Sequence, residues 1–504
     1  MIRPSASRVL GLLVLAAASA AALSTPARSA GKDVFHIDFA TDAASLDPQG
    51  QSDSVSYGVY RNIFDNLLAR DPEGKIGPRV ARAWRYIDPT TIEFDIRDDI
   101  RFQDGTALRP EDVVFTVRRV LDRTFASPQF SNYDQIAAVD VTGPNRVTLQ
   151  TKAPYAPLLA QLVNLSIVPQ AYVEKLGNQR FGLEPMGSGP YGFKAWQKGA
   201  RITLQANQAY WRGKPPFAEV VFHAVPDLAT RIADLRSGRT DFITQLQPED
   251  ADALKNDPKL QVMSIPTERI NFLFMNTLSG PTSDVRVRRA IAYAVDRKTL
   301  IEALTENYGK PVAIDLAPPV FGYTTEVKGY DYDPAKAKAL LKEAGAVGAH
   351  IAFPMSPAYD RRLAEAIQQM LGDVGLQVDI SMLDHPTFMR RRQGRPDEAG
   401  GLSLGRWSCG CQDADGVIYP RYHSGTIWSK YANPEFDRVV DAARATIDPQ
   451  ARLASYRRAF EILREDVPGL GLFQGFEIYA ARKELRWRPS ADEALFIFDM
   501  AWVP

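Results

Sequence analysis

The stretch "EPMGSGPYGFKAWQKGARITLQANQAYW", residues 184–211, joins a Pro/Gly-rich turn to two strand patterns. Gly187 and Gly189 form a G-x-G pair, but Pro190 follows and no third glycine opens a helix. A structural bend is therefore favoured over a phosphate-binding loop. In "RITLQA", residues 201–206, apolar side chains alternate onto one face, which is typical of a half-buried strand. The stretch predicts a sharp turn that leads into strands.

Strand and helix patterns recur along the rest of the chain. Pro110, Asp333 and Asn433 each stand where a helix would begin, as a first-turn proline or an N-cap. Alternation of helix and strand after about residue 284 indicates an α/β lobe. Helices are predicted over residues 109–122, 331–345, 360–375 and 433–444, and strands over residues 91–97, 146–152 and 376–382.

The composition is that of a globular protein with more than one core. The chain has 504 residues, of which 45% are hydrophobic and 24% charged, and its formal net charge is zero. This length is too great for a single core, so two or three lobes are expected. A neutral chain without a basic block argues against a nucleic-acid partner. Two cysteines cannot form a disulfide framework for a chain of this size.

The N-terminus, residues 1–30, has the pattern of a secretory signal peptide. Two arginines precede an apolar run over residues 9–23, and small residues follow. The run is shorter than the roughly 20 residues that a membrane-spanning helix needs. Cleavage is expected after Ala27 or Ser29, and no cysteine stands there to carry a lipid anchor. The pattern predicts a periplasmic protein that is not a lipoprotein.

Both cysteines lie in "SLGRWSCGCQDADGVIYP", residues 403–420. A structural zinc site needs four ligands, but there is no second cysteine pair, and the five histidines show no i, i+3 or i, i+4 spacing. A disulfide between Cys409 and Cys411 would close a tight ring. Alternatively, the two sulfurs shape a loop and contact a ligand. Redox catalysis and a periplasmic metal chaperone are less favoured alternatives.

A G-x-S-x-G string, residues 401–405, raises the alternative of a secreted hydrolase with Ser403 as nucleophile. A nucleophile elbow needs a helix directly after the serine, whereas the glycine-containing "RWSCGCQDADG" follows here. Asp413, Asp415 and His423 also crowd too closely behind the serine for the expected triad order. We therefore expect no enzyme activity.

The run "TFMRRRQGR", residues 387–395, is strongly basic. Such a run is usually a solvated helix face. Alternatively, the run contacts an anionic ligand or a partner.

The opening stretch resembles the signature of the peptide/nickel-type solute-binding proteins of ABC importers. That signature has a Gly-Thr/Ser-Gly-Pro-Tyr turn followed by Trp, Gly, a strand, Asn and Tyr-Trp. The matching residues here are Gly187 to Tyr191, Trp196, Gly199, Asn207, Tyr210 and Trp211. Further blocks follow in the family's order over nearly the whole mature chain, at residues 45–49, 102–122, 235–242, 271–277, 287–301, 332–345 and 431–444.

The resemblance implies an α/β bilobal periplasmic-binding-protein fold, in which two hinged lobes carry an extra domain inserted in the N-terminal lobe. Lobe I would comprise residues 31–72, 185–280 and 482–504. The inserted domain would comprise residues 73–184, and lobe III residues 281–481.

The same resemblance implies the periplasmic substrate-binding component of an ABC importer. A small solute would be buried between lobes I and III, and would favour the closed form because it contacts both lobes at once. The closed form would then dock on the membrane permease. We expect a monomer without cofactor or metal.

The segment after Trp407 indicates whether the ligand carries a free α-ammonium group. In peptide-binding members a Trp is followed three residues later by an Asp that pairs with the α-ammonium group of the ligand. Trp407 and Asp413 are kept here, but the amine-binding position is Gly410. An ammonium group buried without a partner is costly. The sequence therefore favours a modified peptide, or a peptide-like or opine-like solute. A conventional di- or oligopeptide is the alternative.

The family also carries nickel chelates, haem, glutathione and oligosaccharides, so the resemblance leaves the ligand class open. Ser408 and the backbone N–H groups of its loop could donate to an anionic or hydroxylated ligand. The candidate ligand-binding residues are Trp407, Ser408, Cys409, Gly410, Cys411, Asp413, Ser54, Tyr57, Arg269, Asn271, Ser356 and Tyr359.

Overall fold

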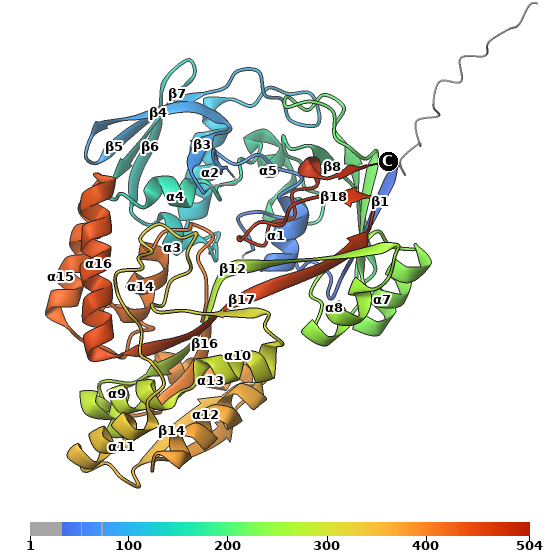
Figure 1. Cartoon of the computed structure of the whole chain (residues 1–504). Coiled ribbons are helices and arrows are strands. Elements are labelled where there is room, and N and C mark those ends of the chain that lie inside the picture. The colour runs from blue at the N-terminus through green and yellow to red at the C-terminus, as the bar shows by residue number, and fades with distance from the viewer. Residues whose placement is uncertain (1–32, 52, 72–73, 504) are drawn as a thin grey trace, which may run out of the picture.

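The computed structural model describes residues 33–51, 53–71 and 74–503. The predicted signal peptide lies outside these residues. Three groups of elements surround two long strands that cross the middle of the molecule (Figure 1). No helix in the described ranges is both long and apolar enough to span a membrane.

The largest sheet has nine strands and extends from lobe I into lobe III. Its order is β16 (Leu402–Trp407), β12 (Leu260–Met275), β17 (Gly469–Arg482), β11 (Phe242–Ile243), β1 (Val34–Phe39), β10 (Glu219–Ala224), β9 (Arg201–Ala206) and β8 (Tyr191–Gln197), and β13 (Gly309–Pro311) also pairs with β17.

Strands β12 and β17 form the connection between the two lobes. They pair antiparallel from Leu260 opposite Arg482 to Phe274 opposite Gly469. The register breaks between Pro266 and Ile270, and such a bulge bends a strand locally. Because both strands run from the lobe I side of the sheet into lobe III (Figure 1), they are the elements about which the lobes can hinge.

Lobe I covers its part of the sheet with short helices and with the last described segment of the chain. Its core contains Phe35 and Ile37 of β1 together with Ile497 and Met500 from the C-terminal segment. Its remaining elements are α1 (Ser54–Tyr60), β2 (Leu68–Arg70), α7 (Leu228–Ser237), α8 (Pro248–Lys255), β18 (Leu485–Arg486), a 3-10 helix (Ile497–Asp499) and β19 (Ala501–Trp502).

The inserted domain is built on a separate four-stranded antiparallel sheet with a core of its own. The members of this core run in sequence from Leu67 to Met186. The elements of this part are β3 (Ile76–Pro78), β4 (Ala81–Asp88), β5 (Thr91–Ile96), α2 (Pro110–Leu121), α3 (Phe130–Tyr133), β6 (Ile136–Gly143), β7 (Arg146–Thr151), α4 (Leu158–Leu162), α5 (Gln170–Leu176) and α6 (Asn178–Phe181).

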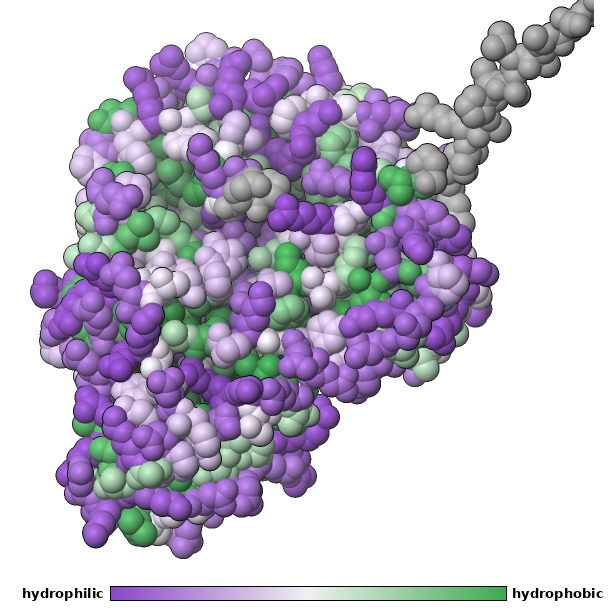
Figure 2. All heavy atoms as spheres, viewed as in Figure 1, coloured by the Kyte–Doolittle hydropathy of each residue, from purple (hydrophilic) through white to green (hydrophobic). Residues whose placement is uncertain are grey.

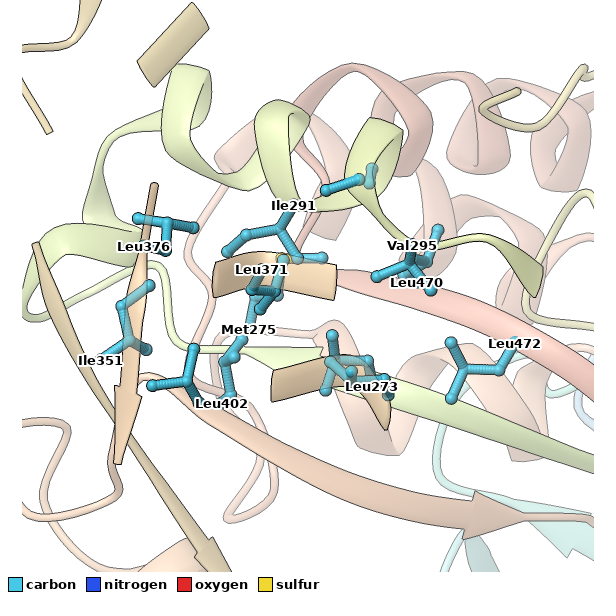
Figure 3. Close-up of a cluster of buried hydrophobic side chains, with 14 of the residues drawn as sticks. Leu273, Met275, Ile291, Val295, Ile351, Leu371, Leu376, Leu402, Leu470 and Leu472 are labelled. Carbon is cyan, nitrogen blue, oxygen red and sulfur yellow. The ribbon is translucent and has the colours of Figure 1, made fainter. Parts of the chain in front are cut away.

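Lobe III has two hydrophobic clusters, one on each face of β12 and β16. Figure 3 shows the first, where Leu273, Met275 and Leu402 meet Ile291 and Leu371 from flanking helices. The second contains Phe272 and Phe274. The elements of lobe III are a 3-10 helix (Pro281–Ser283), α9 (Val285–Ala294), α10 (Arg297–Thr305), α11 (Pro334–Glu343), β14 (His350–Met355), α12 (Arg361–Asp373), β15 (Gln377–Met382), α13 (His385–Gln393), α14 (Asp415–Tyr422), α15 (Pro434–Ala445) and α16 (Pro449–Asp466).

The sequence-predicted helices are confirmed, and their starts follow the expected capping chemistry. The carboxylate of Asp333 accepts from the Lys336 N–H at the start of α11, and the Asn433 amide oxygen accepts from two N–H groups at the start of α15. A capping side chain satisfies N–H groups that the first turn leaves without partners. The predicted strands are confirmed as β5, β7, β9 and β15.

The Pro/Gly-rich turn of the opening stretch packs tightly on lobe I. A Cβ on Gly187 would lie 2.2 Å from the Ile63 carbonyl oxygen, and one on Gly189 would lie 2.6 Å from the Ile63 carbonyl carbon. The Gly189 N–H donates to Ile63 O at 2.8 Å. The glycines are therefore needed for close backbone approach, which is the structural bend that the sequence favours.

Candidate ligand-binding cleft

The loop after β16 meets both lobe I and the inserted domain. The guanidinium of Arg70, on β2, donates to the Cys411 carbonyl oxygen. A Cβ on Gly410 would lie 3.4 Å from the side-chain nitrogen of Asn164, and Gly410 itself is exposed. The loop therefore borders the space between lobe III and the rest of the molecule. On the face shown in Figure 2, hydrophilic residues dominate the outer rim, whereas hydrophobic residues gather toward the middle.

The two cysteines of this loop form a disulfide. Of the alternatives that the sequence leaves open, this is the one present. The bridge lies against Gly416, where an added Cβ would be 2.3 Å from Cys409 Sγ and 2.6 Å from Cys411 Sγ. Because the sulfurs are bonded to each other, they are not thiolate ligands for a metal here. Among the described residues, no group of three His, Cys, Asp or Glu side chains could hold a metal ion.

Asp413 is held inside lobe III by two partners on α16. Its carboxylate accepts from Arg452 Nη2 at 2.9 Å to each oxygen and from the Tyr456 hydroxyl at 3.0 Å. Asp413 and Arg452 are both buried. The carboxylate is therefore already neutralised and hydrogen-bonded, and it fixes the end of the loop.

Trp407 and its neighbours form the base of the loop. The Trp407 indole N–H donates to the Gly416 carbonyl oxygen at 2.9 Å, and its ring contacts Trp428 edge-on with centroids 5.7 Å apart. Ser408 is half-buried beside it.

Ser403, the hydrolase candidate, lies within β16, buried opposite Phe274. It is not at a strand-to-helix turn, so the geometry of a nucleophile elbow is missing.

A cavity of about 100 Å³ opens beside β16 and brings together two of the sequence-predicted residues, Asn271 and Tyr359. The guanidinium of Arg406 also lines it, 5.9 Å from the centre of the Tyr359 ring, and donates to the Ala358 carbonyl oxygen at 3.2 Å. The complete lining is Asn271, Leu304, Thr305, Tyr359, Asp360, Leu363, Leu404, Gly405, Arg406 and Phe473.

Ser356 does not belong to this lining. Its side chain is buried, and its hydroxyl pairs with Nδ1 of His385 at 2.9 Å. The Ser356 hydroxyl also accepts from the Ala358 N–H at 3.2 Å. The residue therefore shapes the loop that carries Tyr359.

Arg269 lies in the bulged part of β12, within a cluster of carboxylates. Its guanidinium donates to both carboxylate oxygens of Glu493, at 3.1 and 2.9 Å. Burial and the neighbouring Asp492 and Glu493 hold the pKa of Glu268 well above its ordinary value. Burial and Glu493 also raise the pKa of Glu477 to about 8. The Arg269 guanidinium is therefore already paired with a carboxylate of the protein.

The two predicted residues on α1 lie on the lobe I side of this cluster. Ser54 is exposed at the first position of the helix. The Tyr57 hydroxyl accepts from the Arg61 guanidinium, which stands 3.9 Å from the Asp492 carboxylate. The predicted residues therefore fall into three groups: the α1 and Arg269 cluster, the cavity, and the loop that contains Gly410.

A family model, Bacterial extracellular solute-binding proteins, family 5 Middle, matches residues 75–429. The chain belongs to this family. It is a solute-binding protein of the ABC-importer type, as the resemblance of the opening stretch indicates.

Relatives within the family match almost end to end. The glutathione-binding protein GsiB of Escherichia coli strain K12 is 26% identical over 478 residues, 92% of each chain. The protein of the same name from Salmonella typhi is 27% identical over 489 residues, 94% of each chain.

Solved structures share the bilobal fold. HbpA2 from Haemophilus parasuis superposes with a TM-score of 0.85 at 21% identity, over 94% of this chain and 100% of that one. AgaA of A. tumefaciens R10, solved in complex with agropinic acid, gives a TM-score of 0.78 at 24% identity, over 94% and 99%. The predicted fold class is confirmed.

Two arginines of lobe III in this family 5 protein, one of which lines the cavity, were not predicted from the sequence. Arg406 is the exposed residue of a strand whose first four residues are buried, so no local pattern marks it. Arg392 is buried although it belongs to a basic run. Its position four residues after the buried Phe388 is the one signal that could have found it, because residues four apart share a helix face.

Proposed function

We propose that this protein captures a small peptide-like or opine-like solute that places no free α-ammonium group at Gly410. The solute is enclosed between lobes I and III and delivered to the permease of an ABC importer. The chain acts as a monomer after export through the signal peptide of residues 1–30, and it binds its solute without chemical conversion.

The proposal rests on the loop after Trp407, in which no carboxylate is available to a ligand. Gly410 supplies no carboxylate, and the carboxylate of Asp413 is taken up by Arg452 and Tyr456. The Asp415 side chain is buried against Arg444 at 2.9 Å. An ammonium group brought to this loop would therefore lack an anionic partner, at a cost of several kcal/mol if buried.

Relatives support a peptide-like or opine-like ligand class. GsiB is a glutathione-binding protein, and AgaA was solved in complex with agropinic acid. A DppA structure holds the peptide STSA, so a conventional peptide binder is the alternative within the same fold. Micromolar capture of any of these needs only about 8 kcal/mol of net binding free energy.

The contact between the loop and lobe I supports enclosure by closure. Arg70 donates from β2 to Cys411 O, so the loop is linked to lobe I in this structure. A ligand that contacts both sides would favour this arrangement because it interacts more strongly with the closed form than with the open form.

The test is a calorimetric comparison of dialanine with N-acetyl-dialanine on the wild type and on the Gly410→Asp variant. We expect the wild type to bind the acetylated compound at least as tightly as the free amine. The variant should shift the preference toward the free amine by about tenfold or more, because the new carboxylate pairs with the ammonium group.

Gly372→Asp is the matched control, since Gly372 lies on α12 with nothing within 4 Å of an added Cβ. It should leave the preference unchanged. Strong wild-type preference for dialanine, together with an unchanged ratio in Gly410→Asp, would show that the loop does not decide the ligand class.

A further inference from the structure

The loop after β16 contacts lobe I and the inserted domain through its main chain. Arg70 Nη2 donates to the Cys411 carbonyl oxygen, while Arg70 Nη1 donates to the Gly74 carbonyl oxygen at 2.6 Å. On the side of the inserted domain, a Cβ on Gly410 would lie 3.4 Å from Asn164 Nδ2. Because Cys411 offers a backbone oxygen to Arg70, this contact between the lobes depends on the path of the main chain through the loop.

Both ends of the loop are anchored within lobe III. Trp407, at the end of β16, is held through its indole N–H. Beyond the loop, the Gln412 carbonyl oxygen accepts from the Phe321 N–H at 3.0 Å, and the Ala414 N–H donates to the Phe321 carbonyl oxygen at 2.8 Å. The segment of residues 409–411 lies between these anchors, and the disulfide joins its two ends.

The disulfide closes a tight turn on itself. Within this turn, the Gln412 N–H donates to the Cys409 carbonyl oxygen at 2.7 Å, and the Cys411 N–H lies 3.3 Å from Cys409 Sγ. Gln412 has a φ of +49°, in the left-handed region that side chains other than glycine seldom adopt. Such a conformation persists where the surrounding structure holds it. The disulfide therefore helps to hold the turn that directs the Cys411 carbonyl oxygen toward Arg70.

Reduction of the disulfide would displace this turn. Sulfur atoms that are not bonded to each other must lie at van der Waals distance, about 3.5 Å or more. The start of α14 limits where they can go, because a Cβ on Gly416 would already lie 2.3 Å from Cys409 Sγ and 2.6 Å from Cys411 Sγ. Cys411 is buried, whereas Cys409 is half-buried and Gly410 is exposed. The segment would therefore move outward, and the Cys411 carbonyl oxygen would leave its place at Arg70.

A small dithiol supplies the electrons for this step. One of its thiolates attacks Cys409 Sγ, the more exposed sulfur, so that the disulfide bond breaks and Cys411 leaves as a thiolate. The second thiolate of the reagent then attacks the reagent sulfur of the mixed disulfide and releases the Cys409 thiolate. The two cysteines take up the two protons that the reagent lost, and the reagent is oxidised to a cyclic disulfide.

We propose that the disulfide between Cys409 and Cys411 is a redox-sensitive clasp of the cleft. In the oxidised protein it holds the Cys411 carbonyl oxygen at Arg70 and so keeps lobe III against lobe I, and a dithiol releases it. The inference rests on the proposed function and deepens it: capture of the solute depends on the oxidation state of the protein. Because disulfides persist in exported proteins and are rare in the cytosol, the clasp would form only after export.

The first experiment measures how readily the disulfide is reduced in the absence of solute. If the disulfide favours the contact with Arg70, that contact must favour the disulfide by the same factor. Wild type and Arg70→Met are equilibrated with graded ratios of reduced and oxidised dithiothreitol, and free thiols are counted by alkylation and mass spectrometry. We expect the equilibrium constant for reduction to be about tenfold larger in Arg70→Met, because the variant lacks a hydrogen bond from a charged donor. Equal constants would overturn the inference.

Arg236→Met is the matched control. Arg236 lies on α7 of lobe I, is exposed, and stands 3.9 Å from the Asp257 carboxylate. This variant removes the same charge from the same lobe without touching the loop, so its reduction constant should equal that of the wild type. A shift as large as that of Arg70→Met would mean that the contact at Cys411 is not the cause.

Small-angle scattering measures the opening of the cleft and needs no arginine variant. Reduced wild type should have a larger radius of gyration than oxidised wild type, and reoxidation should restore the smaller value. The double variant Cys409→Ser, Cys411→Ser should match the reduced wild type and should not respond to dithiothreitol. If Arg70→Met does not fold, this comparison decides alone, and equal radii for oxidised and reduced wild type would contradict the proposal.

Calorimetry with N-acetyl-dialanine connects the clasp to capture. Reduction should weaken binding of this probe to the wild type by about tenfold, and an unchanged affinity would count against the clasp. The reduction constant and the scattering are measured without solute. Failure of N-acetyl-dialanine to bind in either oxidation state would therefore argue against the proposed function, while those two measurements would still decide the clasp.

Discussion

Arg452 and Arg392 are two buried arginines of lobe III with opposite surroundings. Arg452 donates to both oxygens of Asp413 and to the Ala443 carbonyl oxygen at 3.1 Å. The Arg392 guanidinium lies among the rings of Phe272, Phe274 and Trp428, and its Nη1 is 3.4 Å from the Leu404 carbonyl oxygen. The first is a completed ion pair that holds the loop after β16. The second is buried by aromatic packing with no carboxylate within 4.0 Å among the described residues, so the comparison separates a charge that an ion pair compensates from one that it does not.

The largest effect is expected for Arg452→Met. Removing the guanidinium leaves Asp413 buried without its cation, which typically costs about 3–5 kcal/mol of unfolding free energy. Chemical denaturation followed by tryptophan fluorescence measures it. The control is Arg457→Met on the same helix, which removes an exposed pair with Glu326 and should cost less than about 1 kcal/mol. Equal losses for the two variants would contradict the distinction.

Gly416→Ala should destabilise the protein by about 1–3 kcal/mol, because the added methyl group overlaps both sulfurs of the disulfide. Gly372→Ala, where nothing lies within 4 Å, should be neutral or stabilising. Denaturation midpoints compare the two. If the loop could move aside without cost, Gly416→Ala would behave like its control.

Glu477→Gln should flatten the dependence of stability on pH. The folded protein holds the pKa of Glu477 near 8, above its ordinary 4.5. The unfolded chain therefore binds fewer protons over this range, and this group's contribution makes the protein less stable as pH rises from about 4.5 to 8. The glutamine variant should therefore be more stable than the wild type at pH 8 and about equally stable at pH 4.5. Denaturation at both values tests this, and parallel profiles would disprove it.

Arg392→Met should have the smallest effect on stability. The variant removes a buried charge that has no carboxylate partner and keeps an apolar stem, so the free energy of unfolding should change by less than about 1 kcal/mol in either direction. A loss as large as that of Arg452→Met would mean that the fold already compensates the charge of Arg392.

Local chemistry explains why the sequence predicts so much of this fold. Asp333 and Asn433 cap α11 and α15 as expected, because a cap depends on residues within one turn. The pairing of β12 with β17 joins segments some 200 residues apart, and no local pattern encodes it. The resemblance of the opening stretch supplies what periodicity could not, a bilobal architecture.

The candidate site was predicted less completely. Asn271 and Tyr359 do line one cavity. They were predicted as ligand-binding residues from their positions in the segments that resemble the family. Asp413 was predicted as a ligand contact, but its partners Arg452 and Tyr456 come from a helix about forty residues later. Burial of Arg392 depends on Phe272 and Trp428 meeting around it, which is a property of the assembled lobe.

Native mass spectrometry of the protein as purified tests the central claim most directly, because a solute enclosed between lobes can survive purification. The account predicts a bound small molecule that carries no free α-ammonium group. A bound dipeptide with a free amine would contradict it.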